Sequence, residues 1–354
     1  MVAFYILIAI LLFGILILVH ELGHFISAKL SGVQVNEFAL FMGPAIWKKQ
    51  KGETLYALRC IPIGGYCAME GEDGNSDNPR AFSKAKVWKR LIILAAGSFM
   101  NFVAGFLIML MLISFSGFFE AIPGKQLGPI REGRPYENVL QEGDEFYAIN
   151  GERIYVKNAI TMFLERDTDN FYDITVIRNG EKVLLKDVEM RADYVYENGS
   201  VGYGLDVPNK EKTVGNVLSY TWNTTRFFVQ MVRVGLVDLF TGNAKIQDAA
   251  GPVGIVEAVV QQGVQSETVG IGLFNVFNLF AFIAVNLAVM NILPIPALDG
   301  GRIACLLITA AVEKIIGRKL DPKYEGYLHG IFMVLLLAFI ALITFKDILH
   351  LFGG

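Results

Sequence analysis

The strongest constraint in this sequence is an uncharged apolar run, residues 2–19, that leads directly into the motif His20-Glu21-Leu22-Gly23-His24. A helix rises about 1.5 Å per residue, so this run crosses most of a hydrocarbon core roughly 30 Å thick. If the helix continues through the motif, His20 and His24 lie four residues apart on one face. Two imidazoles at that spacing can hold a metal ion, and Glu21 can take a proton from water there.

A polar helix end at the membrane surface is the alternative interpretation of this motif. Ionisable groups beside lipid are costly, and they are normally kept where they pair, face a cavity or do chemistry. The position of the motif at the end of an apolar run therefore favours a catalytic metal site.

The composition is that of a membrane protein, with 53% hydrophobic and only 18% charged residues in a chain of 354. A net charge of −3 gives no reason to expect a nucleic-acid partner, and no motif predicts a small-molecule cofactor. Three cysteines, an odd and sparse count, argue against a disulfide framework.

The predicted fold class is a polytopic α-helical membrane protein with about four transmembrane helices. Four uncharged apolar stretches are long enough to span the bilayer: residues 2–19 (extended by the motif to about 28), 91–119, 268–298 and 326–345. We divide the chain into a membrane core of residues 1–120 and 268–354, an inserted β-rich domain of residues 121–207, and a membrane-surface segment of residues 208–267.

Lys and Arg residues gather between the first and second spans and between the third and fourth. By the positive-inside rule both segments are cytoplasmic, and the termini and the inserted domain lie outside. The first and third spans then both run inward, so the histidine motif and the polar stretch 291–301 end on the same, cytoplasmic side and can meet.

The cytoplasmic segment carries strand signals within residues 33–67, which predict a small hairpin or sheet whose edge could accept an extended peptide. Gly64 and Gly65 are candidate substrate-binding residues in it, although a merely structural hairpin is the alternative. In the inserted domain, Asn179-Gly180 predicts a hairpin turn and residues 158–165 a helix. Residues 218–239 read as an amphipathic helix on the outer membrane face.

A catalytic zinc usually has three protein ligands and an open position, so two histidines need a partner. Asp299 is the preferred candidate, because it ends the third apolar stretch on the correct side and precedes Gly300-Gly301, where backbone can approach closely. A helix cap is its alternative role. Asn291 could hydrogen-bond the substrate or an oxyanion. The other candidate ligands are the acidic residues of the basic segment: Glu37, Glu53, Glu70 and Glu72.

These residues carry a resemblance to the bacterial site-2 proteases, intramembrane zinc metalloproteases of the RseP/RasP type. The family's zinc motif is similar to His20-Glu21-xx-His24, and its second signature to Asn291-xx-Pro294-x-Pro296-x-Leu298-Asp299-Gly300. Further similar blocks are Phe41–Pro44, Ile61–Tyr66, Pro79–Phe82, Val87–Arg90 and Gly251–Ile255. The resemblance implies one Zn²⁺ per chain, with Glu21 as the general base and Asp299 as the third ligand.

The resemblance also implies that residues 121–207 form a single PDZ-type domain and that Asn101, which matches a family position, belongs to the surroundings of the active site. The implied activity is hydrolysis of peptide bonds in transmembrane segments of membrane proteins, such as anti-sigma factors or remnant signal peptides, in a bacterial cell membrane. The partners are then membrane-protein substrates and the lipid bilayer. Alternatives are a non-catalytic membrane scaffold or chaperone, and a transporter that uses the histidine motif as an ion site.

Overall fold

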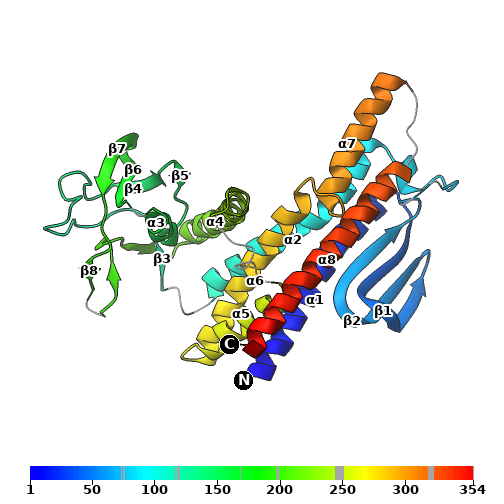
Figure 1. Ribbon diagram of the computed structural model, residues 1–354, viewed down its shortest axis with the longest axis horizontal. Helices are drawn as coiled ribbons and strands as arrows, with labels where there is room; N and C mark the ends of the chain where they lie inside the picture. The colour runs from blue at the N-terminus through cyan, green and yellow to red at the C-terminus, as the bar shows by residue number, and fades with distance from the viewer. Residues whose placement is uncertain are drawn as a thin grey trace. The chain divides into compact units, whose positions relative to one another are not determined.

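The computed structural model describes residues 1–72, 74, 76–115, 117, 120–167, 169–196, 199–243, 251–317 and 323–353, with side chains except at 63, 323–325 and 350–353 (Figure 1). The chain forms two compact units. One contains residues 1–108 and 232–354, and the other contains residues 109–231. We describe each unit by itself.

Four helices are long and apolar enough to cross a membrane, which confirms the four predicted spans and a multi-pass membrane protein. They are α1 (Val2–Ser31), α2 (Val87–Phe115), α6 (Val269–Ile292) and the stretch Gly326–Leu349 of α8 (Lys323–Gly353). Their mean hydropathies are 3.2, 2.2, 2.0 and 2.6, in chain order.

The third span ends six residues earlier than the sequence predicted. The helix stops at Ile292, and Leu293 already has an extended backbone, with φ −63° and ψ 144°. The cause is Pro294, since a proline disfavours the helical conformation of the residue before it. A separate helix that the sequence did not predict, α7 (Asp299–Ile316), follows after an irregular stretch.

The core of the membrane unit is formed by α1, α6 and a short helix, α5 (Pro252–Val264), which starts with a proline in its first turn and was not predicted. Tyr5, Leu12 and Leu16 of α1 pack with Val259 of α5 and Phe280 of α6. Asp347 of α8 accepts hydrogen bonds from the backbone N–H groups of Gly251 and Gly254, at 2.9 and 2.8 Å. It therefore caps the first turn of α5 from another helix.

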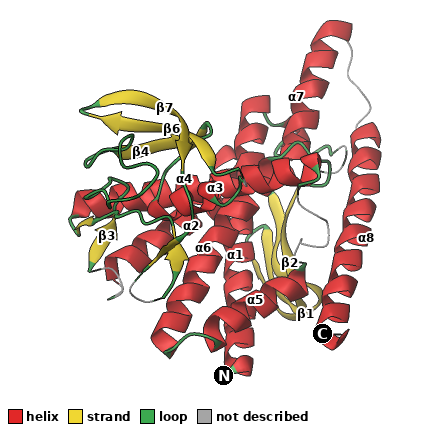
Figure 2. Cartoon of the chain, turned by 60° about the vertical axis from the view of Figure 1, so that its left-hand side comes forward, coloured by secondary structure: helices red, strands yellow, loops and turns green. Residues whose placement is uncertain are grey.

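A long antiparallel hairpin follows α1 and confirms the strands predicted there. Its strands are β1 (Val35–Lys51) and β2 (Thr54–Met69), which pair with several register shifts and lie beside α1 (Figure 2). A second buried cluster contains residues of the hairpin base, α1, α2, α7 and the short helix η1 (Phe82–Lys84): Ala28, Val33, Val35, Cys67, Met69, Phe82, Ile93, Leu94 and Leu306. Through this cluster the base of the hairpin packs against α1, α2 and α7.

The second unit contains a four-stranded sheet in the order β5-β4-β6-β7. Its elements are β4 (Glu145–Ile149), β5 (Glu152–Arg153), β6 (Phe171–Arg178), β7 (Glu181–Glu189) and the predicted helix α3 (Lys157–Leu164). Asn179 and Gly180 have φ of +53° and +84°, as the predicted tight turn between β6 and β7 requires.

Short strands and one long helix complete this part of the chain. The strands are β3 (Ala121–Pro123), which pairs with β10 (Asn209–Glu211), and β8 (Tyr194–Val195), which pairs with β9 (Val201–Gly202). The helix α4 (Val214–Thr241) covers the predicted helix 218–239. The PDZ-type identity of the domain and the membrane-surface position of α4 stay predictions.

Asp144 is expected to be essential for the stability of this sheet. Its carboxylate is 1% exposed and accepts hydrogen bonds from Arg178 Nε and Nη2, at 2.8 and 2.7 Å. Arg178 is 21% exposed and stays partly hydrated without its partner. Loss of charge-assisted hydrogen bonds costs about 1.5–3 kcal/mol, so Asp144→Ala should lower the opening free energy of β6 by that amount in hydrogen exchange on the full chain. Asp193→Ala is the control, because Asp193 is 57% exposed and its pair with Arg134 should contribute about 1 kcal/mol or less. Equal effects of the two substitutions would contradict the expectation.

Candidate metal centre

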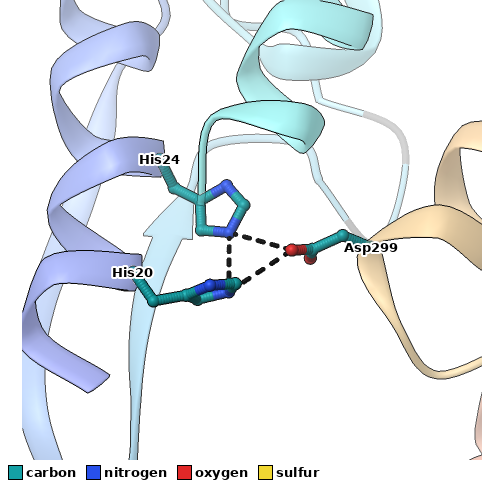
Figure 3. A group of neighbouring side chains, drawn as sticks. All are labelled: His20, His24 and Asp299. Carbon is teal, nitrogen blue, oxygen red and sulfur yellow. Dashed lines mark hydrogen bonds and ion pairs between the residues drawn. The ribbon is translucent and has the colours of Figure 1, made fainter. Parts of the chain in front are cut away.

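Three ligand atoms from α1 and α7 converge in the membrane unit (Figure 3). His20 Nε2 lies 3.2 Å from His24 Nε2, and Asp299 Oδ2 lies 3.3 and 3.4 Å from these two nitrogens. Among the described residues, this is the one group of three or more His, Cys, Asp or Glu side chains whose ligand atoms all lie within 4.8 Å of one another.

The geometry of this group fits a tetrahedral zinc ion. Ligand atoms about 2.05 Å from such an ion lie about 3.3 Å apart, which is the spacing found here. Asp299 Oδ2 is buried, and no hydrogen-bond donor among the described residues satisfies it. A buried carboxylate oxygen without a donor is costly, and a cation held jointly with two imidazoles would compensate for it.

The two histidines can approach each other because α2 lies very close to α1. A Cβ atom at Gly97 would lie 2.3 Å from His24 Nε2 and 2.7 Å from His20 Cε1. A Cβ atom at Gly23 would lie 2.4 Å from the carbonyl oxygen of Ala96. All three distances are shorter than side-chain contacts allow. Glycine at position 97 therefore leaves space for the imidazoles, and glycine at position 23 allows the backbone of α2 to approach α1. Gly97 was not predicted as a functional residue from the sequence, although it lies four residues before Asn101 on the same helix.

His24 is held in one tautomer. Its Nδ1 lies 2.8 Å from the carbonyl oxygen of Ile93 in α2. A carbonyl only accepts, so Nδ1 carries the proton and Nε2 keeps a free lone pair toward the other two ligand atoms. Metal-binding histidines usually have such a partner on the second nitrogen.

Asn101 lies beside His20, where its predicted part in the active-site surroundings requires it. The side chain is 1% exposed, its Nδ2 is 3.3 Å from His20 Nδ1, and its buried Oδ1 has no hydrogen-bond donor among the described residues. The two ends of an amide are nearly the same in shape. Turned by 180°, Asn101 would accept the Nδ1 proton of His20 and leave Nε2 of that ring free as a ligand atom.

Asp299 is the first residue of α7, so the expectation that it ends the third span is wrong. The irregular stretch before it contains Ala297, with φ +81°, whose N–H donates to His329 Nδ1 at 3.0 Å. A Cβ atom at Gly300 would lie 2.2 Å from the carbonyl oxygen of Ile292, which agrees with the expected close approach of backbone. His329 of α8 therefore contacts the stretch that leads to Asp299.

The remaining predicted residues differ in their surroundings. Glu21 is half-buried on α1, and a Cβ atom at Gly65 of β2 would lie 3.2 Å from its Cγ. Gly64 is next to Met42 instead. Asn291 is half-buried in the last turn of α6, and none of the hydrogen bonds among described residues joins it to the three ligands.

The four glutamates considered as alternative ligands have other partners. Glu37 pairs with Arg59 at 2.6 Å, Glu70 accepts hydrogen bonds from Asn36 and Ser76, and Glu72 pairs with Arg302. Hydrogen bonds from Arg80 and Lys29 lower the pKa of Glu53 to about 2. Asp299 is the carboxylate that lies against both imidazoles.

Two histidines of an apolar helix, with Glu21 next to His20 in the sequence and a carboxylate of α7 at zinc-ligand spacing, are typical of a membrane-bound zinc metallopeptidase. The sequence matches peptidase family M50 over residues 8–339. A Clostridium perfringens protein described as a candidate zinc metalloprotease is 35% identical over 98% of each chain. The "zinc metalloprotease RasP" of Bacillus licheniformis is 29% identical, and the "regulator of sigma-W protease RasP" of Bacillus subtilis is 28% identical, each over 97% of this chain and 98% of the relative.

The chain therefore belongs to peptidase family M50, the site-2 protease family, which confirms the resemblance inferred from its motifs. It is a zinc-dependent metalloendopeptidase of the membrane.

Gly97 is expected to be required for metal binding. In Gly97→Val, the added side chain would occupy the space of the imidazoles, so the purified protein should contain much less zinc by elemental analysis. Gly105→Ala is the matched control, because it also crowds a close helix contact of α2, with Val285 of α6, but not the histidines. Wild-type zinc content in Gly97→Val would contradict the expectation.

Proposed function

We propose that this protein hydrolyses peptide bonds within or at the end of transmembrane helices, with one zinc ion held by His20, His24 and Asp299. The observation that carries the proposal is the spacing of the three ligand atoms, 3.2 to 3.4 Å, between helices of a membrane unit. When bound, zinc would supply a Lewis acid that polarises the scissile carbonyl and makes water a stronger nucleophile.

Glu21 is the proposed general base and then general acid. It follows His20 directly on α1, and its Cγ lies next to β2 at Gly65. In this role it takes the proton of the attacking water and then gives it to the leaving amine of the cleaved peptide. The Glu21 side chain is half-buried between α1 and the hairpin. In the proposed function this position limits the access of bulk water to the transferred proton.

The substrate must present an extended segment to these groups. The carbonyl and N–H groups of a transmembrane helix are already paired with each other, so the helix has to open locally before cleavage. The edge of β2 near Gly64 and Gly65 is the proposed partner of the opened segment, since added strands hydrogen-bond through their backbone. Asn291 and Asn101 are further candidates for contacts to the substrate or to an oxyanion.

The proposed orientation follows from the charges. The basic segments between α1 and α2 and between α6 and α8 are cytoplasmic, so the metal centre lies toward the cytoplasmic side and both termini lie outside with the PDZ-type domain. The name of the Bacillus subtilis relative refers to regulation of sigma-W. Membrane-bound anti-sigma factors and remnant signal peptides are therefore the proposed substrate classes, in a bacterial cell membrane.

Two other functions would use the same sequence differently. A scaffold or chaperone that presents the inserted domain would not depend on Glu21 or zinc. A transporter using the histidine motif would move ions across vesicles and release no peptide products. The buried carboxylate shared between two imidazoles favours the peptidase.

The role of Glu21 can be tested by Glu21→Gln. The variant should keep its zinc, since Glu21 is not a ligand, and should lose cleavage of a transmembrane substrate by a factor of at least about 100, because general base catalysis is removed. Zinc content and cleavage are measured on the same purified, metal-loaded sample. Near-normal cleavage by that sample would refute the role.

The role of Asp299 can be tested by its substitution with alanine. Asp299→Ala should bind zinc more weakly, measured by competition with a chromogenic chelator, because only two ligands remain. Glu70→Ala is a control, since Glu70 is occupied by Asn36 and Ser76. Unchanged zinc affinity in Asp299→Ala would transfer the third-ligand role to one of the glutamates between α1 and α2.

A further inference from the structure

The first turn of α7 carries a charged residue next to the proposed ligand. Arg302 lies three residues after Asp299, on nearly the same face of the helix. Its Nη1 forms an ion pair with Oε1 of Glu72, which lies in the segment that follows β2. The Arg302 side chain is 33% exposed and that of Glu72 is 16% exposed. The pair is partly shielded from water, so salt screens it less than a fully exposed pair.

The other carboxylate oxygen of Glu72 contacts the hairpin. Oε2 accepts a hydrogen bond from the backbone N–H of Met69, the last residue of β2, at 3.3 Å. One carboxylate therefore joins the end of β2 to the helix turn that carries Asp299.

The segment that holds Glu72 is itself firmly attached. The N–H of Glu70 donates to the carbonyl oxygen of Gln34 at 3.0 Å, and the N–H of Phe82 donates to the carbonyl oxygen of Glu70 at 2.7 Å. Met69 and Phe82 also belong to the buried cluster that contains Leu306 of α7. Glu72 can thus act as a fixed point for Arg302.

We propose that the Glu72–Arg302 ion pair is a positioning contact that sets where Asp299 lies relative to His20 and His24 and links that position to β2. The inference rests on the proposed ligand role of Asp299. His20 and His24 are held by one continuous helix, whereas Asp299 follows an irregular stretch with two prolines. A metal ligand must be held to within about 0.5 Å, so it needs contacts that fix its own helix.

The charges of the two residues explain why loss of either one should weaken metal binding. Glu72 lies close enough to Glu21 for their carboxylates to repel each other, and Arg302 offsets that negative charge. Without the pair, the first turn of α7, which carries Asp299, loses a contact to the segment that follows β2. Each single substitution should therefore weaken metal binding, although neither residue is a ligand.

The test uses the full-length protein purified in detergent. Zinc affinity is measured by chelator competition, and the absorption spectrum of the Co²⁺-substituted protein reports the geometry of the ligands. Glu72→Gln and Arg302→Gln should each lower zinc affinity about tenfold, the low end of the range for groups that orient ligands, and should change the Co²⁺ spectrum. Arg302→Lys, which keeps the charge, should bind more tightly than Arg302→Gln.

The decisive variant is the exchange of the two charges, Glu72→Arg with Arg302→Glu, which should recover affinity and spectrum relative to the single variants. Glu53→Gln is the matched control, because it removes an acidic partner of Arg80 at the turn of the same hairpin. It should bind zinc as the wild type does. A circular dichroism spectrum of each variant verifies that its helices are intact.

Two results would overturn the inference: wild-type affinity in both single variants, or loss in both without recovery in the exchanged pair. His24→Ala separates this failure from failure of the proposed site. If His24→Ala loses zinc while Glu72→Gln does not, the proposed zinc site is supported and the positioning role of the Glu72–Arg302 pair is refuted. If His24→Ala binds zinc as tightly as the wild type, the proposed site itself is wrong.

Discussion

The metal centre depends on the close contact between α1 and α2. Glycines at positions 23 and 97 allow the two helices to approach so closely that a single added methyl group would collide with a backbone carbonyl or with an imidazole. Small residues at such contacts are the usual means by which membrane helices pack, because lipid provides no hydrophobic force between them. Here the same contact brings the Ile93 carbonyl to His24 Nδ1. The contact that packs α1 against α2 therefore also orients the His24 ring.

Polar groups in the membrane unit are placed where another element satisfies them. Asp347 of α8 accepts the free N–H groups at the start of α5, and His329 of α8 accepts the N–H of Ala297 before Asp299. Unpaired backbone groups are costly in an apolar environment, so each irregular or terminal stretch needs such a partner. The break between α6 and α7, caused by Pro294, is tolerated for this reason, and it frees the chain to turn Asp299 toward α1.

The hairpin of β1 and β2 is joined to the metal centre at two places. Gly65 brings β2 against Glu21, and Glu72 connects the end of β2 to α7. In the proposed function, a substrate strand held by β2 would therefore lie beside the general base. The element that receives the peptide and the elements that hold the metal would then move together rather than independently.

The sequence by itself determined the features that depend on short-range periodicity. Apolar runs predicted four spans, the i, i+4 spacing placed His20 and His24 on one face, and Asn179-Gly180 specified a hairpin turn, because each pattern acts within a few residues. Tertiary structure alone decided the partners: Ile93 lies 69 residues from His24, and Glu72 lies 230 residues from Arg302. Such pairs depend on how helices pack, and the residues near each partner in the sequence do not specify that packing. The space left by Gly97 was missed for the same reason, whereas Pro294 is a local signal for the break that precedes α7.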